Sequence, residues 1–268
     1  METTTTCFHH TDRETGRACT RCGRPACAEC LHDAPVGSHC WECIRAARPP
    51  LRQRARRWNA TVGPLATKAI VAANVLVFLF TMSDPTLERR LALSAPSVHG
   101  GDWWRLVTSG FVHYGLLHIA FNMLLLWQFG TMLEPAIGRV RFVALYLAAL
   151  LCGSFGAVWL SPHALTAGAS GAVFGLVGAA AVGLRQRGIS VWDTGVGGLL
   201  LINLVLTFAI PNISVGGHVG GLLGGTAVGA LMLDTRPGRT NVAVSLLVAV
   251  AVAALALYGG LWAAARTA

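Results

Sequence analysis

Charged residues are scarce in this chain. Asp, Glu, Lys and Arg make up 12% of its 268 residues, whereas soluble domains carry about 25%. Hydrophobic residues account for 54%, so the composition excludes an ordinary soluble globular protein and indicates a membrane protein. We expect no nucleic-acid partner, because ten of the 21 Lys and Arg residues lie in the first 57 positions, before the apolar segments. The first residues also lack the apolar core of a signal peptide, so we expect none there.

Motifs of several membrane proteins are also missing. The chain contains no HExxH sequence, which excludes a zinc metalloprotease of that type. Gly100–Gly101–Asp102 is faintly similar to an aspartyl-protease motif, but it lies in a predicted loop and we dismiss it. No paired charged residues follow a pathway through the apolar segments, which disfavours a transporter.

Apolar sequence is abundant after residue 64. A spanning helix needs about 20 predominantly apolar residues, and short polar breaks divide this part of the chain into seven candidate segments. They cover residues 65–82, 115–133, 142–160, 168–184, 191–210, 216–233 and 242–264. We therefore predict an all-α polytopic membrane protein, with a six-helix bundle over 65–233 and one additional C-terminal helix.

The fourth and fifth segments have unusual compositions. The fourth is short and rich in glycine, so we expect it to be buried among the other helices. In the fifth, Asp193 is expected in the first turn, where the helix dipole tolerates a carboxylate. Asn203 is expected to hydrogen-bond to a neighbouring helix.

Basic residues predict the orientation of the segments. Eleven Lys and Arg residues occur up to Lys68, and the breaks at 161–167 and 211–215 carry none. A cytoplasmic N-terminus places 17 of the 21 basic residues inside. We therefore expect a multi-pass protein of the plasma membrane, with its N-terminus in the cytoplasm and its C-terminus outside.

In this orientation, polar residues lie at the external ends of segments two, four and six. His118 and Asn122 are four residues apart, which places them on one helix face; Ser170 opens the fourth segment and His218 the sixth. All lie about 5–10 Å below the membrane surface. Ser170 is a candidate nucleophile and His218 its general base. His118, Asn122 and the N–H groups at Ser170 are candidate oxyanion donors. No membrane carboxylate is placed to orient His218, so we expect a Ser–His dyad.

Each of these residues also has a structural interpretation. A serine at a helix start is usually an N-cap, and His118 and Asn122 could bond neighbouring helices. A membrane histidine is harder to explain in this way, because intramembrane ionisable groups are rare and usually functional. The coincidence of all four residues at one depth favours a catalytic site.

Glycines recur every four residues along segments four and six. The positions are Gly171, Gly175, Gly217, Gly221, Gly225 and Gly229. Small residues at this spacing let two helices approach closely. We expect the close approach to bring His218 against Ser170.

These residues resemble the rhomboid family of intramembrane serine proteases. The motifs that carry the resemblance are Trp104–Arg105, HIAFN at 118–122, GxxxE followed by GxxRF at 130–142, GASG at 168–171 and GHVGG at 217–221. The resemblance implies a rhomboid protease domain over 65–233, with Ser170 as nucleophile and His218 as base, and no cofactor for catalysis. The helix at 242–264 resembles the six-plus-one arrangement of some rhomboids. The resemblance also implies structural roles for Trp104, Arg105, Glu134, Arg141, Gly168, Gly171, Gly217 and Gly221.

One residue departs from the family pattern. A position that commonly holds tyrosine is Phe174 here. We expect its ring still to pack beneath His218, although it has no hydroxyl to offer. The resemblance implies cleavage of transmembrane-protein substrates within the lipid bilayer, near the external ends of their helices. The alternative is a catalytically silent member that binds membrane clients; such members commonly lack the serine or the histidine, and both are present here.

The first 43 residues hold seven of the eight cysteines, in pairs with metal-knuckle spacing. The candidate ligands are Cys7, His10, Cys19, Cys22, Cys27, Cys30, Cys40 and Cys43. Eight ligands suffice for two tetrahedral zinc ions, and the cytoplasm disfavours disulfides. We predict two structural zinc sites in a domain of residues 1–43, followed by a basic linker over 44–64.

This head is similar to B-box-type zinc domains, whose ligand pairs often cross-brace. The similarity implies that the first pair joins the third and the second joins the fourth; sequential pairing is the alternative. His9, His32 or His39 could substitute for a ligand. We also expect the head to bind a cytoplasmic protein partner.

Overall fold

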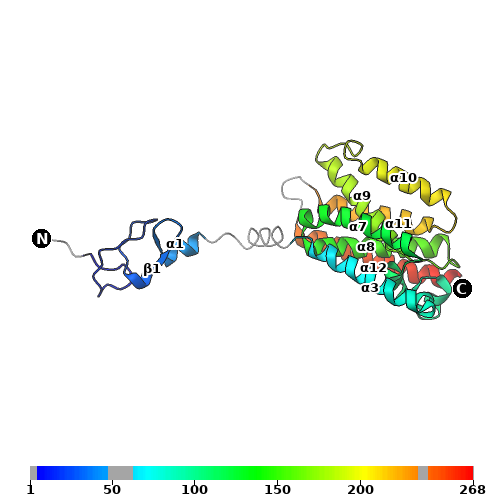
Figure 1. The fold of residues 1–268 in the computed structure, drawn as a ribbon, viewed down its shortest axis with the longest axis horizontal. Helices are drawn as coiled ribbons and strands as arrows, with labels where there is room; N and C mark the ends of the chain where they lie inside the picture. Colours follow the sequence, from blue (N-terminus) through cyan, green and yellow to red (C-terminus); the bar gives the residue numbers. More distant parts are fainter. Residues whose placement is uncertain (1–4, 48–62, 235–240, 268) are drawn as a thin grey trace. The chain divides into compact units, whose positions relative to one another are not determined.

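Each of the seven predicted membrane segments forms a helix in the computed structural model, which describes residues 5–47, 63–234 and 241–267. The chain divides into two units, Met1–Trp58 and Asn59–Ala268. Figure 1 shows the helices of the larger unit and the small elements of the other. Most of the predicted linker, residues 48–62, lies outside the described residues.

Seven main helices lie in the described part of the larger unit. They are α3 (Leu65–Ser83), α7 (Leu116–Ile137), α8 (Arg139–Leu160), α9 (Ser170–Gln186), α10 (Val196–Ala209), α11 (Val215–Met232) and α12 (Val242–Thr267). Short elements connect α3 to α7, namely α4 (Pro85–Leu91), α5 (Ala95–His99), α6 (Arg105–Thr108) and the 3-10 turn η2 (Ser109–Phe111). Among the described helices, α3, α7, α8, α11 and α12 are long and apolar enough to cross a membrane, and α10 is a shorter apolar helix. The predicted all-α polytopic class is confirmed.

Glycine doublets make α11 the centre of the packing. The sequence VGGHVGGLLGG repeats a Gly–Gly pair every four residues, so two adjacent stripes of the helix lack side chains. A Cβ added to Gly216 would overlap the backbone of Gly156 in α8, and one added to Gly221 would overlap the backbone of Gly171 in α9. One stripe therefore contacts α8 and the other contacts α9, and in both contacts the backbones of the two helices touch.

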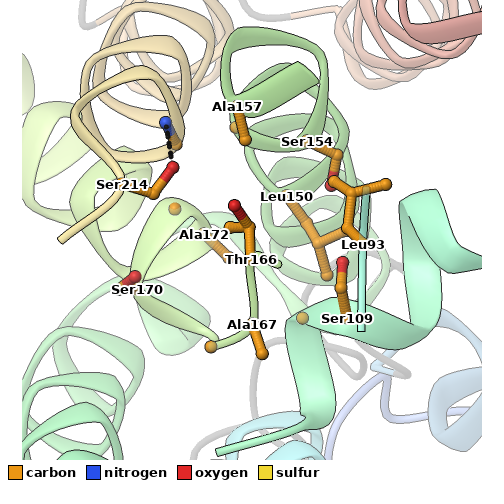
Figure 2. A pocket seen from close by; sticks show the side chains of 15 residues that line it. Leu93, Ser109, Leu150, Ser154, Ala157, Thr166, Ala167, Ser170, Ala172 and Ser214 are labelled. Atoms are coloured by element: carbon orange, nitrogen blue, oxygen red, sulfur yellow. Dashed lines mark hydrogen bonds between the residues drawn. The ribbon is translucent and has the colours of Figure 1, made fainter. Parts of the chain in front are cut away.

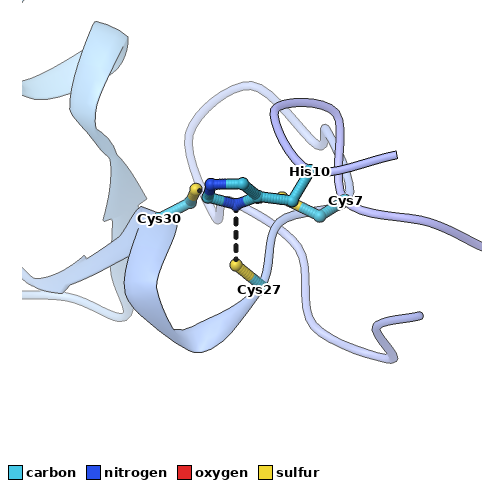
Figure 3. Close-up of side chains that lie close together, drawn as sticks. All are labelled: Cys7, His10, Cys27 and Cys30. Atoms are coloured by element: carbon cyan, nitrogen blue, oxygen red, sulfur yellow. Dashed lines mark hydrogen bonds between the residues drawn. The ribbon is translucent and has the colours of Figure 1, made fainter. Parts of the chain in front are cut away.

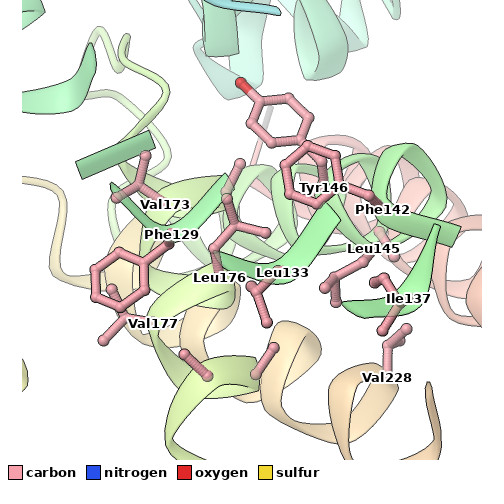
Figure 4. Packing of buried hydrophobic residues seen from close by; sticks show 14 of the residues in the cluster. Phe129, Leu133, Ile137, Phe142, Leu145, Tyr146, Val173, Leu176, Val177 and Val228 are labelled. Carbon is pink, nitrogen blue, oxygen red and sulfur yellow. The ribbon is translucent and has the colours of Figure 1, made fainter. Parts of the chain in front are cut away.

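The largest apolar core lies where α7, α8, α9 and α11 meet (Figure 4). Phe129 and Leu133 of α7 pack there with Phe142 and Leu145 of α8 and Leu176 of α9, all almost fully buried. Most of α9 is buried in this way, which confirms the expectation for the short fourth segment. The outer faces of α3 and α12 instead keep large apolar side chains exposed, as helices that contact lipid do.

The fifth segment begins later than predicted. Residues 191–195 form turns, and α10 starts at Val196 after a left-handed Gly195 with φ of 75°. Asp193 therefore lies before the helix and not in its first turn, because turn conformations over these residues precede the glycine that starts α10. The expected interhelical bond from Asn203 is also wrong: its Nδ2 donates to Leu199 O of the same helix at 2.8 Å, which satisfies the amide one turn away.

Residues 5–47, the described part of the smaller unit, contain little regular structure. A 3-10 turn η1 (Ala28–Cys30) leads into the antiparallel hairpin of β1 (Leu31–Asp33) and β2 (Ser38–Cys40), and α1 (Trp41–Ala46) follows. Its buried clusters consist mainly of cysteines, with Ala26 and the flanking Phe8 and Leu31. Such a small core stabilises a fold poorly without a disulfide or a metal.

Candidate active site

Ser170 is the first residue of α9, and the chain before it is held in place. The Gly168 N–H donates to Ser109 O at 2.9 Å. Gly168 itself has φ of 130°, which favours glycine. The N-cap of α9 is Ala169, without a side-chain cap bond. The N-cap interpretation of Ser170 is therefore wrong, and its hydroxyl is not used to cap the helix.

His218 lies in the first turn of α11 and is 9% exposed. Its ring stacks on Phe174 of α9, with ring centroids 4.2 Å apart and planes inclined by 20°. The expectation that this aromatic ring packs against His218 is confirmed. At the edge of the imidazole, Nδ1 lies 2.7 Å from Oγ1 of Thr207 in α10. The ring is thus held by a neighbour on each of two helices.

The crossing of α9 and α11 brings Ser170 and His218 into one region. A Cβ on Gly171 would lie 3.1 Å from Gly217 O, so the residues next to the candidate pair touch through their backbones. Phe174, on which the His218 ring stacks, lies one turn after Ser170 on the same face of α9. No hydrogen bond joins Ser170 to His218 within the described part of the chain. Catalytic pairs are often loose in this way before substrate binds.

His118 and Asn122 approach the same region from α7. The Tyr114 N–H donates to His118 Nδ1 at 3.2 Å, so the proton of the neutral ring lies on Nε2. A Cβ at Gly168 would lie 2.8 Å from His118 Nε2 and 3.5 Å from Ser170 Oγ, so these two groups flank the same point. Asn122 Nδ2 donates to His118 O at 2.9 Å. An N–H donor and a hydroxyl thus meet at the start of α9.

His113 is a residue of this region that the sequence analysis missed. It lies in the loop before α7 and is 1% exposed. Its Nε2 accepts the backbone N–H of Ala169 at 3.3 Å, and its ring meets that of His118 edge-on at 5.0 Å. In the sequence, the only indication of a role for His113 was its position five residues before His118. A loop position has no helical face from which its direction could be predicted.

Arg105 organises the loop between α3 and α7. Its guanidinium pairs with Asp102, with Nη2 and Oδ2 2.7 Å apart. It also donates to Arg89 O at 2.7 Å and to Ala92 O at 3.0 Å. The neighbouring Trp104 is exposed and serves as backbone N-cap of α6. Arg105 therefore fixes the connection that precedes the site.

Glu134 ties α7 to the start of α3. Its carboxylate accepts the N–H groups of Ala66 and Thr67 at 2.9 and 2.8 Å and the Thr67 hydroxyl at 2.8 Å. Glu134 is 2% exposed, and Arg139 lies 3.6 Å away. Arg141 Nε donates to the last turn of α7 at 2.6 Å. A carboxylate from one helix thus caps another, where the dipole favours negative charge.

A small cavity adjoins Ser170, between α8, α9 and α11 (Figure 2). Its volume is about 30 Å³, whereas a water molecule needs about 10–15 Å³. Ser154 and Ser214 line it together with Ser170. Ser214 Oγ also accepts the Gly217 N–H at 3.1 Å, which caps α11. The cavity is large enough for water next to the candidate nucleophile.

Comparison with known proteins identifies the family. A family model described as a rhomboid domain matches residues 100–235, half of the chain. Putative rhomboid protease YdcA of Bacillus subtilis is 30% identical over 146 residues, which cover 53% of this chain and 73% of YdcA. The chain belongs to the rhomboid family. This rhomboid is also 36% identical over 208 residues to Rhomboid protease GluP of Bacillus subtilis, and 34% identical over 157 residues to RHOMBOID-like protein 7 of Arabidopsis thaliana.

The alignments cover different shares of the chains. The match to GluP covers 74% of this rhomboid and 41% of GluP, and the match to RHOMBOID-like protein 7 covers 56% and 50%. This rhomboid therefore spans about half the length of these two relatives, or less. The apolar helices and the family together make it a multi-pass membrane protein. The rhomboid domain starts after the cysteine-rich head, which the family match leaves out.

The head of this rhomboid gathers its candidate ligands into two groups. One consists of Cys7, His10, Cys27 and Cys30 (Figure 3), and the other of Cys19, Cys22, Cys40 and Cys43. This is the cross-braced arrangement, so the sequential alternative is wrong. His9, His32 and His39 belong to neither group. In each group the ligand atoms lie within 4.8 Å of one another.

The spacing of these atoms fits a tetrahedral metal ion. With metal–sulfur bonds of about 2.3 Å, two thiolates in a tetrahedron lie about 3.8 Å apart. Cys22 and Cys40 Sγ are 3.8 Å apart, and His10 Nδ1 lies 3.4 Å from Sγ of both Cys27 and Cys30. Both groups could therefore hold a metal ion.

Arg24 adds a positive charge beside the second group. Its Nε donates to Cys22 Sγ at 3.4 Å, and this bond lowers the pKa of the Cys22 thiol. Arg24 also pairs with Glu42, and the pairing lowers the pKa of that carboxyl. Thiolates are the metal-binding form of cysteine, so Arg24 favours the ligand form of Cys22.

Proposed function

We propose that this rhomboid is a serine endopeptidase that cleaves transmembrane helices of membrane-protein substrates near their external ends. The observation that carries the proposal is the stacking of His218 on Phe174, one turn after Ser170, at a backbone contact between α9 and α11. That arrangement holds an imidazole and a hydroxyl that does not cap its helix in one region. The relatives named as rhomboid proteases support the same activity.

The proposed chemistry assigns one role to each side chain. Ser170 Oγ attacks the scissile carbonyl, and its proton passes to Nε2 of His218. His118 Nε2–H, the Asn122 amide and the N–H of Ser170 then donate to the oxyanion of the tetrahedral intermediate. His218 gives the proton to the leaving amine, and an acyl-enzyme on Ser170 remains. Water in the adjacent cavity attacks this ester, with His218 again accepting the proton. The bond between the acyl carbon and Ser170 Oγ then breaks, His218 returns that proton to Ser170 Oγ, and the carboxyl product leaves.

We also propose the placement of the protein. The N-terminal head lies in the cytoplasm and the start of α9 faces the outside of the plasma membrane, because basic residues concentrate before α3. The head binds two zinc ions. All four positions of each tetrahedron come from protein, so the ions are structural and supply no step of the cleavage reaction. A cytoplasmic protein that docks on the head is the expected partner.

Cleavage of a reporter transmembrane segment by the full chain in proteoliposomes tests the proposal. Ser170→Ala and His218→Ala are expected to abolish cleavage with the helical content unchanged. Ser245→Ala is the matched control, because it removes a buried hydroxyl of α12 that only bonds Val242 O. Cleavage at the wild-type rate by Ser170→Ala would contradict the nucleophile assignment.

A client-binding rhomboid without protease activity is the second candidate. The absence of a Ser170–His218 hydrogen bond in the described residues is the observation that favours it. In that case the wild-type chain retains the transmembrane segment in a pull-down from liposomes but produces no fragment. Ser170→Ala would then bind as well as wild type, and neither protein would cleave.

A further inference from the structure

Thr207 carries a buried hydroxyl that has no role in the mechanism proposed above. It lies near the end of α10 and is 1% exposed. The connection from α10 to α11 spans only residues 210–214, so the two helix ends are adjacent. This places Thr207 against the first turn of α11. Its Oγ1 is 2.7 Å from His218 Nδ1.

The same hydroxyl makes a second short contact. Thr207 Oγ1 is 2.7 Å from Asn203 O, one turn earlier in α10. A carbonyl oxygen only accepts, and a hydroxyl has one proton to donate. Both contacts become hydrogen bonds only if Thr207 donates to Asn203 O and accepts from His218 Nδ1–H. In the opposite arrangement, two oxygen lone pairs would face each other at 2.7 Å.

The direction of these bonds determines the state of the base. With its proton on Nδ1, neutral His218 carries a lone pair on Nε2, the atom that must accept the Ser170 proton. The other tautomer places a proton on Nε2 and cannot act as that base. Phe174 stacks on the His218 ring but has no polar group that could bond it. Within the described residues, Thr207 is the side chain that hydrogen-bonds to the imidazole.

We propose that Thr207 is the positioning residue of the active site, and that it fixes the Nδ1–H tautomer and the orientation of His218. The inference rests on the proposed function. Thr207 accepts a hydrogen bond from His218 and donates one to a helix carbonyl, and it occupies the place where many serine proteases use a carboxylate. It carries no charge, so it orients the imidazole and weakly stabilises the imidazolium through Nδ1–H, without a buried ion pair in the membrane.

Two variants of Thr207 separate the hydroxyl from the packing of the side chain. Thr207→Val keeps the shape and removes the hydroxyl, whereas Thr207→Ser keeps the hydroxyl and removes the methyl group. Thr81→Val is the matched control, because Thr81 is also buried and bonds only carbonyls of its own helix, at 3.0 and 3.2 Å. All are measured as full chains in proteoliposomes with a reporter transmembrane segment.

We expect Thr207→Val to lower kcat about 10–100-fold, a part of the effect of a general base, with KM changed less than about twofold. Labelling of Ser170 by a fluorophosphonate should slow by the same factor. Thr207→Ser should recover most of the rate, and Thr81→Val should match wild type. A wild-type kcat in Thr207→Val overturns the proposal. Equal losses in the Val and Ser variants also overturn it, because they assign the effect to packing.

A second measurement does not depend on activity. Nitrogen-15 NMR of histidine-labelled protein in nanodiscs reports which ring nitrogen of His218 carries the proton, with assignment from a His218→Asn sample. We expect protonated Nδ1 in wild type and a mixture of tautomers in Thr207→Val. A dominant Nε2–H form in wild type contradicts the role of Thr207. Failure of the proposed protease function would instead appear as absent cleavage and labelling by wild type, with this tautomer unchanged.

Discussion

The contact between α9 and α11 is the feature on which the site depends, and Gly221→Ala perturbs it directly. A Cβ on Gly221 would lie 2.9 Å from Gly171 Cα and closer still to Gly171 O. Backbone atoms cannot rotate away as a side chain would, so the two helices must separate. Overpacking of this kind costs about 1–3 kcal/mol, which exceeds the roughly 0.5–1 kcal/mol that alanine gains over glycine within a helix.

The same separation moves Ser170 away from His218, because Gly171 adjoins the serine. A shift of about 1 Å in a catalytic pair can lower a rate about 100-fold. We therefore expect Gly221→Ala to unfold at a lower temperature in detergent and to react with a fluorophosphonate at least about tenfold more slowly. The assay is the rate of Ser170 labelling, read beside a thermal unfolding curve.

Gly198→Ala is the control for this experiment. Gly198 lies in α10 with nothing within 4 Å of an added Cβ, so alanine there should be neutral or slightly stabilising. Wild-type stability and wild-type labelling in Gly221→Ala would refute the close crossing of α9 and α11.

Three further predictions concern the surrounding structure. Glu134→Ala should destabilise the larger unit by about 1–3 kcal/mol, because it leaves the first N–H groups of α3 without their buried acceptor. Thermal unfolding beside the conservative Glu134→Gln, with a smaller expected loss, measures it, and equal stability of Ala and wild type would contradict the cap. Elemental analysis should find about two zinc ions per chain, and a chelator should unfold the head while the helical signal of the larger unit persists; a metal-free, folded head would exclude the metal sites. His118→Ala should lower kcat less than Ser170→Ala does, because it removes one oxyanion donor and leaves the nucleophile; complete loss of Ser170 labelling would show that His118 does more than donate to the oxyanion.

Features with a short repeat could be predicted from the sequence. The glycines of α9 and α11 recur every four residues, and that periodicity alone indicates which helix faces lack side chains. The apolar segments predicted the main helices for a different reason, which is that a membrane span has a fixed minimum length. In the head, the paired spacing identified the candidate ligands that the structure gathers into two groups, and the similarity to B-box domains supplied their cross-braced grouping.

Features that depend on a single long-range contact could not be predicted. Thr207 and His113 hydrogen-bond to partners 11 and 56 residues away, and neither position belongs to a repeat. Asn203 illustrates the opposite error, since a polar residue in a membrane helix can bond its own backbone as readily as another helix. The start of α10 was misplaced because Gly195 adopts a left-handed conformation, which an apolar window does not detect.

Mass spectrometry of the full chain after reaction with a fluorophosphonate tests the central claim most directly. The account predicts a single phosphonylated serine at Ser170, with labelling abolished in His218→Ala and retained in Ser245→Ala. An unlabelled wild-type protein that is folded by its helical signal, or a label on another serine, would contradict it.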